Sequence, residues 1–201
     1  MAVLWNRHRF SGGVLVLDTT NTVVLRGDDA RSFDRFADTV EIARFAEAAG
    51  SFRAGELGGR ELVFDATDAA AKRVIGLRET SDAFFRRAVV SSHLDTTLLP
   101  AVLRAAAACL DGADEMIGGV DQPFGDQATP MRFETALGVS ALSLLAGDEW
   151  RKIRICPNCN WLFVDRSRNA SRLWCDMAVC GNREKARRHY ERGKTKEVAY
   201  G

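Results

Sequence analysis

Four cysteines gathered near the C-terminus constrain this chain more than any other feature. Cys156 and Cys159 are separated by two residues, fifteen residues follow, and Cys175 and Cys180 are separated by four. Two short cysteine pairs with such a spacer are typical of tetrahedral zinc sites. Four thiolates leave no open coordination position, so the spacing predicts one structural Zn²⁺ and not a catalytic metal.

Other uses of the cysteines stay open at this point. A redox CxxC motif is expected near a βαβ pattern, which does not surround Cys156, and it would leave the second pair unexplained. An iron–sulfur cluster could use the same four ligands. Disulfides are disfavoured in the reducing cytoplasm, where we expect this chain. The fifth cysteine, Cys109, falls on the inward face of a predicted helix and is expected in the core.

Charge is divided unevenly along the 201 residues, although the formal net charge is only +1. Residues 1–150 hold 15 Lys/Arg and 22 Asp/Glu, whereas residues 151–201 hold 13 and 5. A basic segment of this kind is typical of a nucleic-acid-binding module. The candidate contacts are Arg166, Arg168, Arg172, Arg183, Lys185, Arg187 and Arg188.

The alternative to binding is a basic surface that only faces solvent. Helix-forming residues extend from Arg183 to Arg192, and Gly193 is expected to end that helix. Pairs of Glu184 with Arg188 and of Arg187 with Glu191, four residues apart, would neutralise part of it.

The first 150 residues predict a mainly helical domain, with the second domain at 151–201. A helix is expected at 40–49, because the N-cap residues Asp38-Thr39 precede it and Gly50 is expected to end it. Further helices are expected from Thr67-Asp68 onward, at 97–110 and at 131–146. Residues 55–65 predict a loop or short hairpin. Residues 13–25 fit a strand or a helix, and residues 111–130 a long loop or a hairpin. The overall class is mainly α, with possible short β-hairpins.

Catalytic and membrane signals are weak. The run from Ser91 to Asp95 contains serine, histidine and aspartate, but it lacks the Gly-bounded elbow of a serine hydrolase. Gly118-Gly119 is not followed by the Lys-Ser/Thr of a phosphate-binding loop. We therefore expect no enzyme. Apolar runs are too short for a membrane span or a secretory signal, so we expect a cytoplasmic protein without membrane contact.

The basic segment closely resembles the CGNR zinc-finger family, named for a run that is Cys180–Arg183 here. Its order of knuckle, hairpin, knuckle and helix also resembles a treble clef. In that family the finger follows a mainly helical ABATE domain, in bacterial proteins inferred to be stress-induced transcription regulators. Residues 17–22, Leu-Asp-Thr-Thr-Asn-Thr, are similar to the ABATE run Leu-Asp-Phe-x-Asn-Thr, with Thr19 in place of the aromatic residue. The matching finger positions are Cys156, Cys159, Phe163, Asp165, Ser167, Arg168, Arg172, Trp174, Cys175, Met177, Cys180, Gly181, Asn182, Arg183 and Lys185.

The resemblance implies the four cysteines as zinc ligands and a DNA-binding transcription regulator. Asp165 would accept hydrogen bonds from Arg168, Arg172 or a nearby amide, and Asn182 would cap the last helix. The helical domain would sense a small-molecule effector, with Asp18 and Asn21 as candidate pocket residues, or form a homodimer. Alternatives are a protein-interaction module scaffolded by zinc, and an RNA-binding protein that stacks bases on Trp161 or Trp174.

Overall fold

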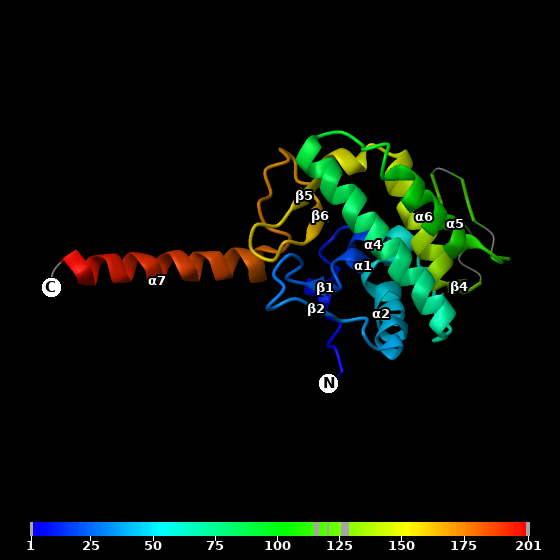
Figure 1. Ribbon diagram of the computed structural model, residues 1–201, viewed down its shortest axis with the longest axis horizontal. Coiled ribbons are helices and arrows are strands. Elements are labelled where there is room, and N and C mark those ends of the chain that lie inside the picture. Colours follow the sequence, from blue (N-terminus) through cyan, green and yellow to red (C-terminus); the bar gives the residue numbers. More distant parts are fainter. Residues whose placement is uncertain (1, 115–116, 120, 126–128, 200–201) are drawn as a thin grey trace.

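The fold is mainly α, as predicted, and ends in one long projecting helix (Figure 1). A computed structural model describes residues 2–114, 117–119, 121–125 and 129–199, with side chains described as far as Glu191. Its α-helices are α1 (Leu15–Thr20), α2 (Thr39–Phe52), α3 (Ala54–Leu57), α4 (Asp68–Ser91), α5 (Leu99–Leu110), α6 (Phe133–Ala146) and α7 (Asn182–Ala199).

Helix α4 is the central element of the body and packs against α1, α5 and α6. Thr67 caps it as predicted, because its hydroxyl oxygen accepts a hydrogen bond from the Ala70 amide at 3.2 Å. One face of α4 repeats with the helical period of 3.6 residues, and every residue of this face is buried. These are Ala70, Val74, Leu77, Ser81, Phe84, Phe85 and Ala88.

Four predicted helix boundaries were wrong by two residues or more, and one of them is the start of the helix expected at 97–110, which begins at Leu99. Helix α2 continues through Gly50 to Phe52, and α7 continues through Gly193 to Ala199. A glycine ends a helix when its backbone turns left-handed, and Gly50 does not have a positive φ. At the start of the predicted helix 131–146, Met131 and Arg132 form a strand, and α6 begins at Phe133.

The strands form three short pairs. Strands β1 (Val23–Val24) and β2 (Phe33–Asp34) are antiparallel, and β3 (Leu62–Val63) and β4 (Met131–Arg132) are parallel. Strands β5 (Ile153–Ile155) and β6 (Leu162–Val164) form the antiparallel hairpin expected of the basic segment. The region 13–25, for which the sequence allowed either a strand or a helix, contains both a helix, α1, and a strand, β1.

The region 111–130 is only partly described. Residues 115, 116, 120 and 126–128 lie outside the described residues, and the described ones belong to no helix or strand. The buried guanidinium of Arg60 holds this segment against the body. Its nitrogens donate to the Phe124 carbonyl at 2.6 Å and to the Thr129 carbonyl at 2.8 Å.

The β5–β6 hairpin has two buried faces. Ile153, Leu162 and Val164 belong to the same hydrophobic core as the helical body, whereas Phe163 packs with the four cysteines. Residues on both sides of position 150 thus share one core. The division into domains at this position stays a prediction.

Helix α7 leaves the body at the end where β5 and β6 lie (Figure 1). Its 18 residues correspond to a rod of about 27 Å at 1.5 Å per residue. Within the described part of the chain, no helix has the length and apolarity that crossing a membrane requires.

Candidate metal centre

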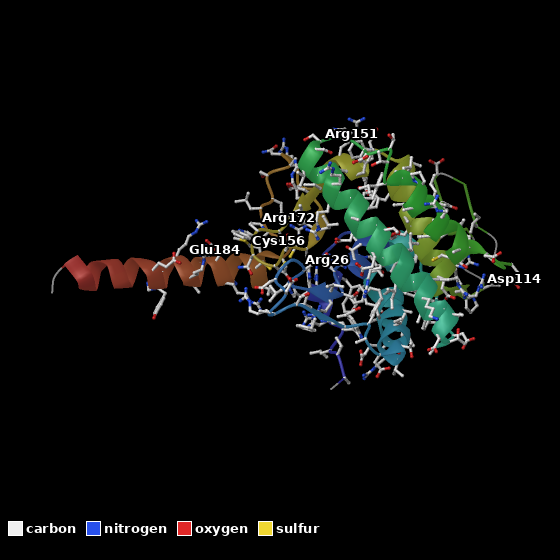
Figure 2. The ribbon with its side chains drawn as sticks, viewed as in Figure 1. Arg26, Asp114, Arg151, Cys156, Arg172 and Glu184 are labelled. Atoms are coloured by element: carbon white, nitrogen blue, oxygen red, sulfur yellow. The ribbon has the colours of Figure 1, made fainter. Side chains whose placement is uncertain are left out.

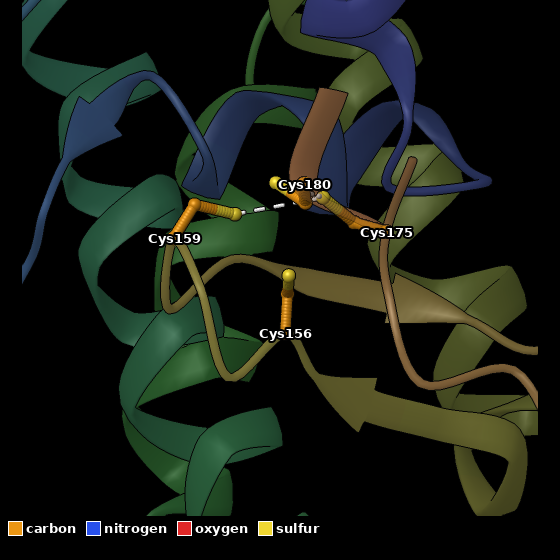
Figure 3. Close-up of side chains that lie close together, drawn as sticks. All are labelled: Cys156, Cys159, Cys175 and Cys180. Atoms are coloured by element: carbon orange, nitrogen blue, oxygen red, sulfur yellow. Dashed lines mark hydrogen bonds between the residues drawn. The ribbon is translucent and has the colours of Figure 1, made fainter. Parts of the chain in front are cut away.

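The first cysteine pair lies on a tight turn between β5 and β6. The Cys156 amide donates to the Trp161 carbonyl at 2.8 Å, and the Asn160 amide donates to the Cys156 carbonyl at 2.8 Å. Asn160 adopts a left-handed conformation with φ of 63°. This turn is the predicted knuckle, and it points Cys156 and Cys159 toward the second pair (Figure 3).

The second pair comes from the approach to α7. Cys175 lies in the loop after the hairpin, and Cys180 lies in a single π-helical turn, Met177–Gly181, that leads directly into the helix. Asp176 caps this turn by accepting a hydrogen bond from the Ala178 amide at 2.8 Å. The last ligand therefore sits at the start of the final helix, as the spacing predicts.

The sulfur atoms have the separation of a tetrahedral zinc site. All four lie within 4.8 Å of one another, with 3.5 Å between those of Cys159 and Cys175 and 3.7 Å between those of Cys175 and Cys180 (Figure 3). A zinc–sulfur bond of about 2.3 Å places neighbouring sulfurs of a tetrahedron about 3.8 Å apart. None of the cysteines forms a disulfide. The four cysteines thus form a site for one structural zinc ion.

Burial and charge also suit a metal. Cys156, Cys175 and Cys180 are fully buried and Cys159 is nearly so. Hydrogen bonds among the thiols lower the pKa of Cys156 and raise the pKa of Cys159 and Cys175, so the thiolates of this cluster need a cation to be stable together. Zinc binds thiolates and not thiols, so the donor set fits the ion.

Asp165 organises the loop between the two pairs. Its carboxylate accepts hydrogen bonds from the backbone amides of Ser167 and Arg172, both at 2.9 Å. The predicted partner is therefore an amide and not a guanidinium. The Arg172 guanidinium instead donates to the carbonyls of Trp174 and Cys175 and so braces the loop next to the metal ligands (Figure 2).

Gly181 and Asn182 have local roles at the start of α7. A Cβ atom on Gly181 would stand 2.3 Å from the Met177 sulfur, so a larger residue would displace that side chain. Asn182 is the first residue of α7, and its side-chain amide donates to the Ala178 carbonyl at 3.0 Å. It is thus a donor to the preceding turn, whereas a capping side chain would accept a hydrogen bond.

Comparison with known proteins adds one match. Residues 152–193 match the family model described as CGNR zinc finger. Searches of curated proteins and of solved structures found no match. The matched residues contain β5, the knuckle, β6, all four cysteines and the start of α7. The residues that match this family model are thus the ones that contain the metal site.

Four of the seven predicted nucleic-acid contacts have partners within the chain. Arg166 binds both Glu149 oxygens at 2.7 Å, and Arg172 braces the loop beside the metal ligands. Arg187 and Arg188 both bind Glu184, whose pKa they lower to about 2 (Figure 2). The expected pairs Glu184–Arg188 and Arg187–Glu191 are present, at 2.8 and 3.5 Å.

The other three contacts are open to solvent. Arg168, Arg183 and Lys185 are exposed and make no ion pair with any described carboxylate. The aromatic residues are less available. Trp161 is 3% exposed, so the expectation that it stacks on RNA bases was wrong, and Trp174 is half-buried.

Several contacts between the finger and the body could not be predicted from the sequence. The Arg86 guanidinium donates to Asn160, and the Asn160 side chain donates to the Arg26 carbonyl at 2.6 Å. His8 stacks on Trp161 with ring centroids 5.1 Å apart and contacts Asp176 at 2.9 Å. These residues are far apart in the sequence and follow no motif, so only the fold brings them together.

The two candidate pocket residues have different surroundings. Asn21 pairs with Leu162 through both its carbonyl and its amide, at 3.0 and 2.8 Å, and links α1 to β6. Asp18 is fully buried and accepts hydrogen bonds from Arg53 and from the Gly12 amide. Burial raises the pKa of Asp18 to about 6.

Neither of the two candidate pocket residues lines the cavity of about 440 Å³ that is found nearby, but Arg53, the partner of Asp18, does. Arg53 and Glu56 line it from the body, and Arg166 lines it from the finger together with its partner Glu149. Burial raises the pKa of Glu56 to about 7, although the carboxylate accepts hydrogen bonds from Ser140 and the Leu15 amide. The cavity therefore adjoins one of the predicted nucleic-acid contacts.

The serine–histidine–aspartate run forms the exposed end of α4. The Ser91 hydroxyl donates to the backbone carbonyls of Arg87 and His93, and the ring of His93 contacts the Ser91 carbonyl. Asp95 accepts hydrogen bonds from Thr97. These contacts are those of a helix end followed by a turn.

Proposed function

We propose that this protein is a DNA-binding transcription regulator whose CGNR zinc finger and α7 contact the duplex. The observation that carries the proposal is the placement of α7. The base with the metal site holds a helix that projects from the body (Figure 1). The first turn of this helix carries two exposed cations, Arg183 and Lys185, that pair with no described carboxylate. Cationic side chains on a rigid projecting helix suit phosphate contacts, which supply most non-specific affinity.

The charge distribution supports DNA over an acidic protein partner. Residues 151–201 hold 13 Lys/Arg against 5 Asp/Glu, so this segment has a large excess of positive charge. A buried aromatic such as Trp161 disfavours single-stranded RNA, whose recognition relies on stacking.

The proposal is tested by fluorescence anisotropy with a random duplex at two salt concentrations. Each phosphate contact contributes about −0.9 to the slope of log K against log salt. Replacing Arg183 and Lys185 by alanine should weaken binding and reduce the magnitude of the slope by about 2. A control is Arg104→Ala, which removes an exposed cation from α5. The proposal fails if wild type shows no salt-sensitive binding, or if the control weakens binding equally.

The helical body is proposed to receive a small-molecule effector in the cavity beside Arg53 and Glu56. The support is that the cavity reaches Arg166, so a ligand that engages Glu149 would compete with the Arg166 pair. Ligand binding and nucleic-acid binding would then be coupled through one arginine. A homodimer remains an expectation from the limited specificity of a single finger.

A further inference from the structure

Three buried hydrogen-bond donors without partners belong to the N-terminal segment, to the β1–β2 region and to the residue before β6 in the finger. They are Arg9 Nε, Arg35 Nη1 and Trp161 Nε1, and none has a hydrogen-bond partner among the described residues. Buried donors are almost always satisfied, and an unpaired one often marks the place of an absent ion or water. Unpaired donors on neighbouring parts of the fold suggest a ligand that accepts several hydrogen bonds.

Arg35 contacts the Trp161 ring directly, and Arg9 follows a residue that stacks on this ring. The Arg35 guanidinium carbon lies 5.6 Å from the centre of that ring, and Arg35 is only 7% exposed. His8, the neighbour of Arg9 in the short 3-10 helix Arg7–Phe10, stacks on the same ring. Three segments far apart in the sequence thus meet at Trp161.

The charges of the two arginines are not neutralised. The nearest carboxylate to Arg35 in the sequence, Asp34, binds both terminal nitrogens of Arg78 at 2.7 Å. Asp176 is held by His8. Neither Arg9 nor Arg35 forms an ion pair within the ranges that the structure describes.

Burial and, in addition, neighbouring positive charges lower the pKa values of Arg9 and Arg35. Burial and then the charge of Arg9 lower the pKa of Arg35 to about 10. Burial and then Arg183 lower the pKa of Arg9. Arg183, at the start of α7, is thus close enough to add its charge to the same group. An anion among these cations would relieve the repulsion.

We propose that Arg9, Arg35 and the indole N–H of Trp161 bind a phosphate group, with Arg183 at the rim of the site. Phosphate matches this donor set because it accepts several charge-assisted hydrogen bonds at once, and arginine is suited to bind it. The phosphate comes from a duplex backbone or from a small phosphorylated compound. With the backbone as its source, the site rests on the proposed function.

The test follows the four tryptophan indole signals in ¹H–¹⁵N NMR spectra while inorganic phosphate is added at constant ionic strength. The signal of Trp161 should move and saturate, and those of Trp5, Trp150 and Trp174 should move little. Arg35→Met and Arg9→Met should weaken phosphate binding at least tenfold, because each removes a charged donor. Arg7→Met is the matched control, since Arg7 is exposed on the same 3-10 helix.

A short duplex added in a second titration separates the sources. If it moves the Trp161 signal, and Arg35→Met weakens duplex binding more than Arg7→Met, the source is the backbone. If phosphate moves the signal and the duplex does not, the source is a small compound. The site is refuted if neither ligand moves Trp161 selectively, or if Arg7→Met weakens phosphate binding as much as Arg35→Met.

Zinc content and duplex affinity distinguish the phosphate site from a purely structural role of the arginines and from the proposed function. If the arginines only balance the charge of the zinc thiolates, Arg35→Met lowers zinc affinity and phosphate leaves Trp161 unmoved, which overturns the site. If the duplex binds and depends on Lys185 while Trp161 stays unmoved, the proposed function stands and the phosphate site fails. If phosphate moves Trp161 and no duplex binds, the site stands without the proposed function.

Discussion

Single side chains decide which cations of the finger are available for binding. Arg166 is held by Glu149 in a two-pronged ion pair and also donates to the Gly13 carbonyl at 2.9 Å. An arginine in such a pair can contact a phosphate only after its carboxylate is displaced. Glu149 therefore restrains one of the predicted contacts.

Replacing Glu149 by glutamine should release Arg166 and strengthen duplex binding several-fold. Asp148→Asn is the control, because it removes the same charge from a neighbouring side chain that is 93% exposed and 3.5 Å from Arg151. Anisotropy titrations of both variants provide the measurement. Equal affinities for the two variants would show that Arg166 takes no part in binding.

Buried Glu56 gives the protein a pH dependence of its own. Its pKa is raised from 4.5 to about 7, so between these values the folded protein binds more protons than the unfolded chain. The free energy of unfolding therefore decreases as the pH rises through this range, and the contribution is complete only below about pH 4.5.

Glu56→Gln should remove this dependence. The amide can still accept from the Leu15 amide and donate to Ser140, so at pH 8 the variant should be more stable than wild type by on the order of 2 kcal/mol. The difference should vanish toward pH 4.5. Urea denaturation at several pH values measures it, with exposed Glu47→Gln as the control. A difference that does not change with pH would contradict the assignment to Glu56.

At the scale of elements, the sequence predicts helices best where an apolar period and a cap agree. Helix α4 has both, with Thr67 at its start and Phe84 and Phe85 on its buried face. The metal ligands were equally predictable, because their spacing is local. Strands of two residues such as β3 and β4 depend on partners about 70 residues away, so no local sequence pattern predicts them.

Two glycine substitutions, one of them inside α2, test whether a position tolerates a larger side chain. A Cβ on Gly50 would have nothing within 4 Å, so Gly50→Ala should stabilise α2 by about 0.5–1 kcal/mol. A Cβ on Gly12 would lie 2.8 Å from the Asp18 carboxylate and 2.9 Å from the Leu17 backbone, so Gly12→Ala should destabilise the protein. Calorimetric melting temperatures should shift in opposite directions. A lower melting temperature for Gly50→Ala would contradict this view of α2.

For the whole molecule, the zinc site and the helical body should not be independent. The hairpin that carries the knuckle contributes Ile153, Leu162 and Val164 to the core of the body. The sequence marked a change of composition at residue 150, but it contained no sign that the packing continues across it. Shared packing of this kind depends on which hairpin face meets α1 and α4, which only the fold determines.

Loss of zinc should therefore lower the melting temperature of the whole chain. Cys175→Ser should reduce bound zinc below one ion per chain and destabilise the body, because a loosened hairpin uncovers its core. Cys109→Ser is the matched control, since Cys109 is buried in the body and donates to the Arg73 carbonyl at 3.5 Å. Calorimetry together with metal analysis provides the measurement. A body that melts at the same temperature after zinc removal would show that the two parts are separate.

The hydrogen bonds between Asn21 and Leu162 require a particular side chain at position 21 but not at position 162. Asn21 contributes its side chain, whereas residue 162 contributes only its backbone N–H and carbonyl. A finger of different sequence could therefore be grafted onto this body and keep the contact, provided that its strand follows the same path. A body without the asparagine would leave two peptide groups unpaired inside the protein. Chimeras of such proteins should accordingly tolerate exchange of the finger more readily than a change at position 21.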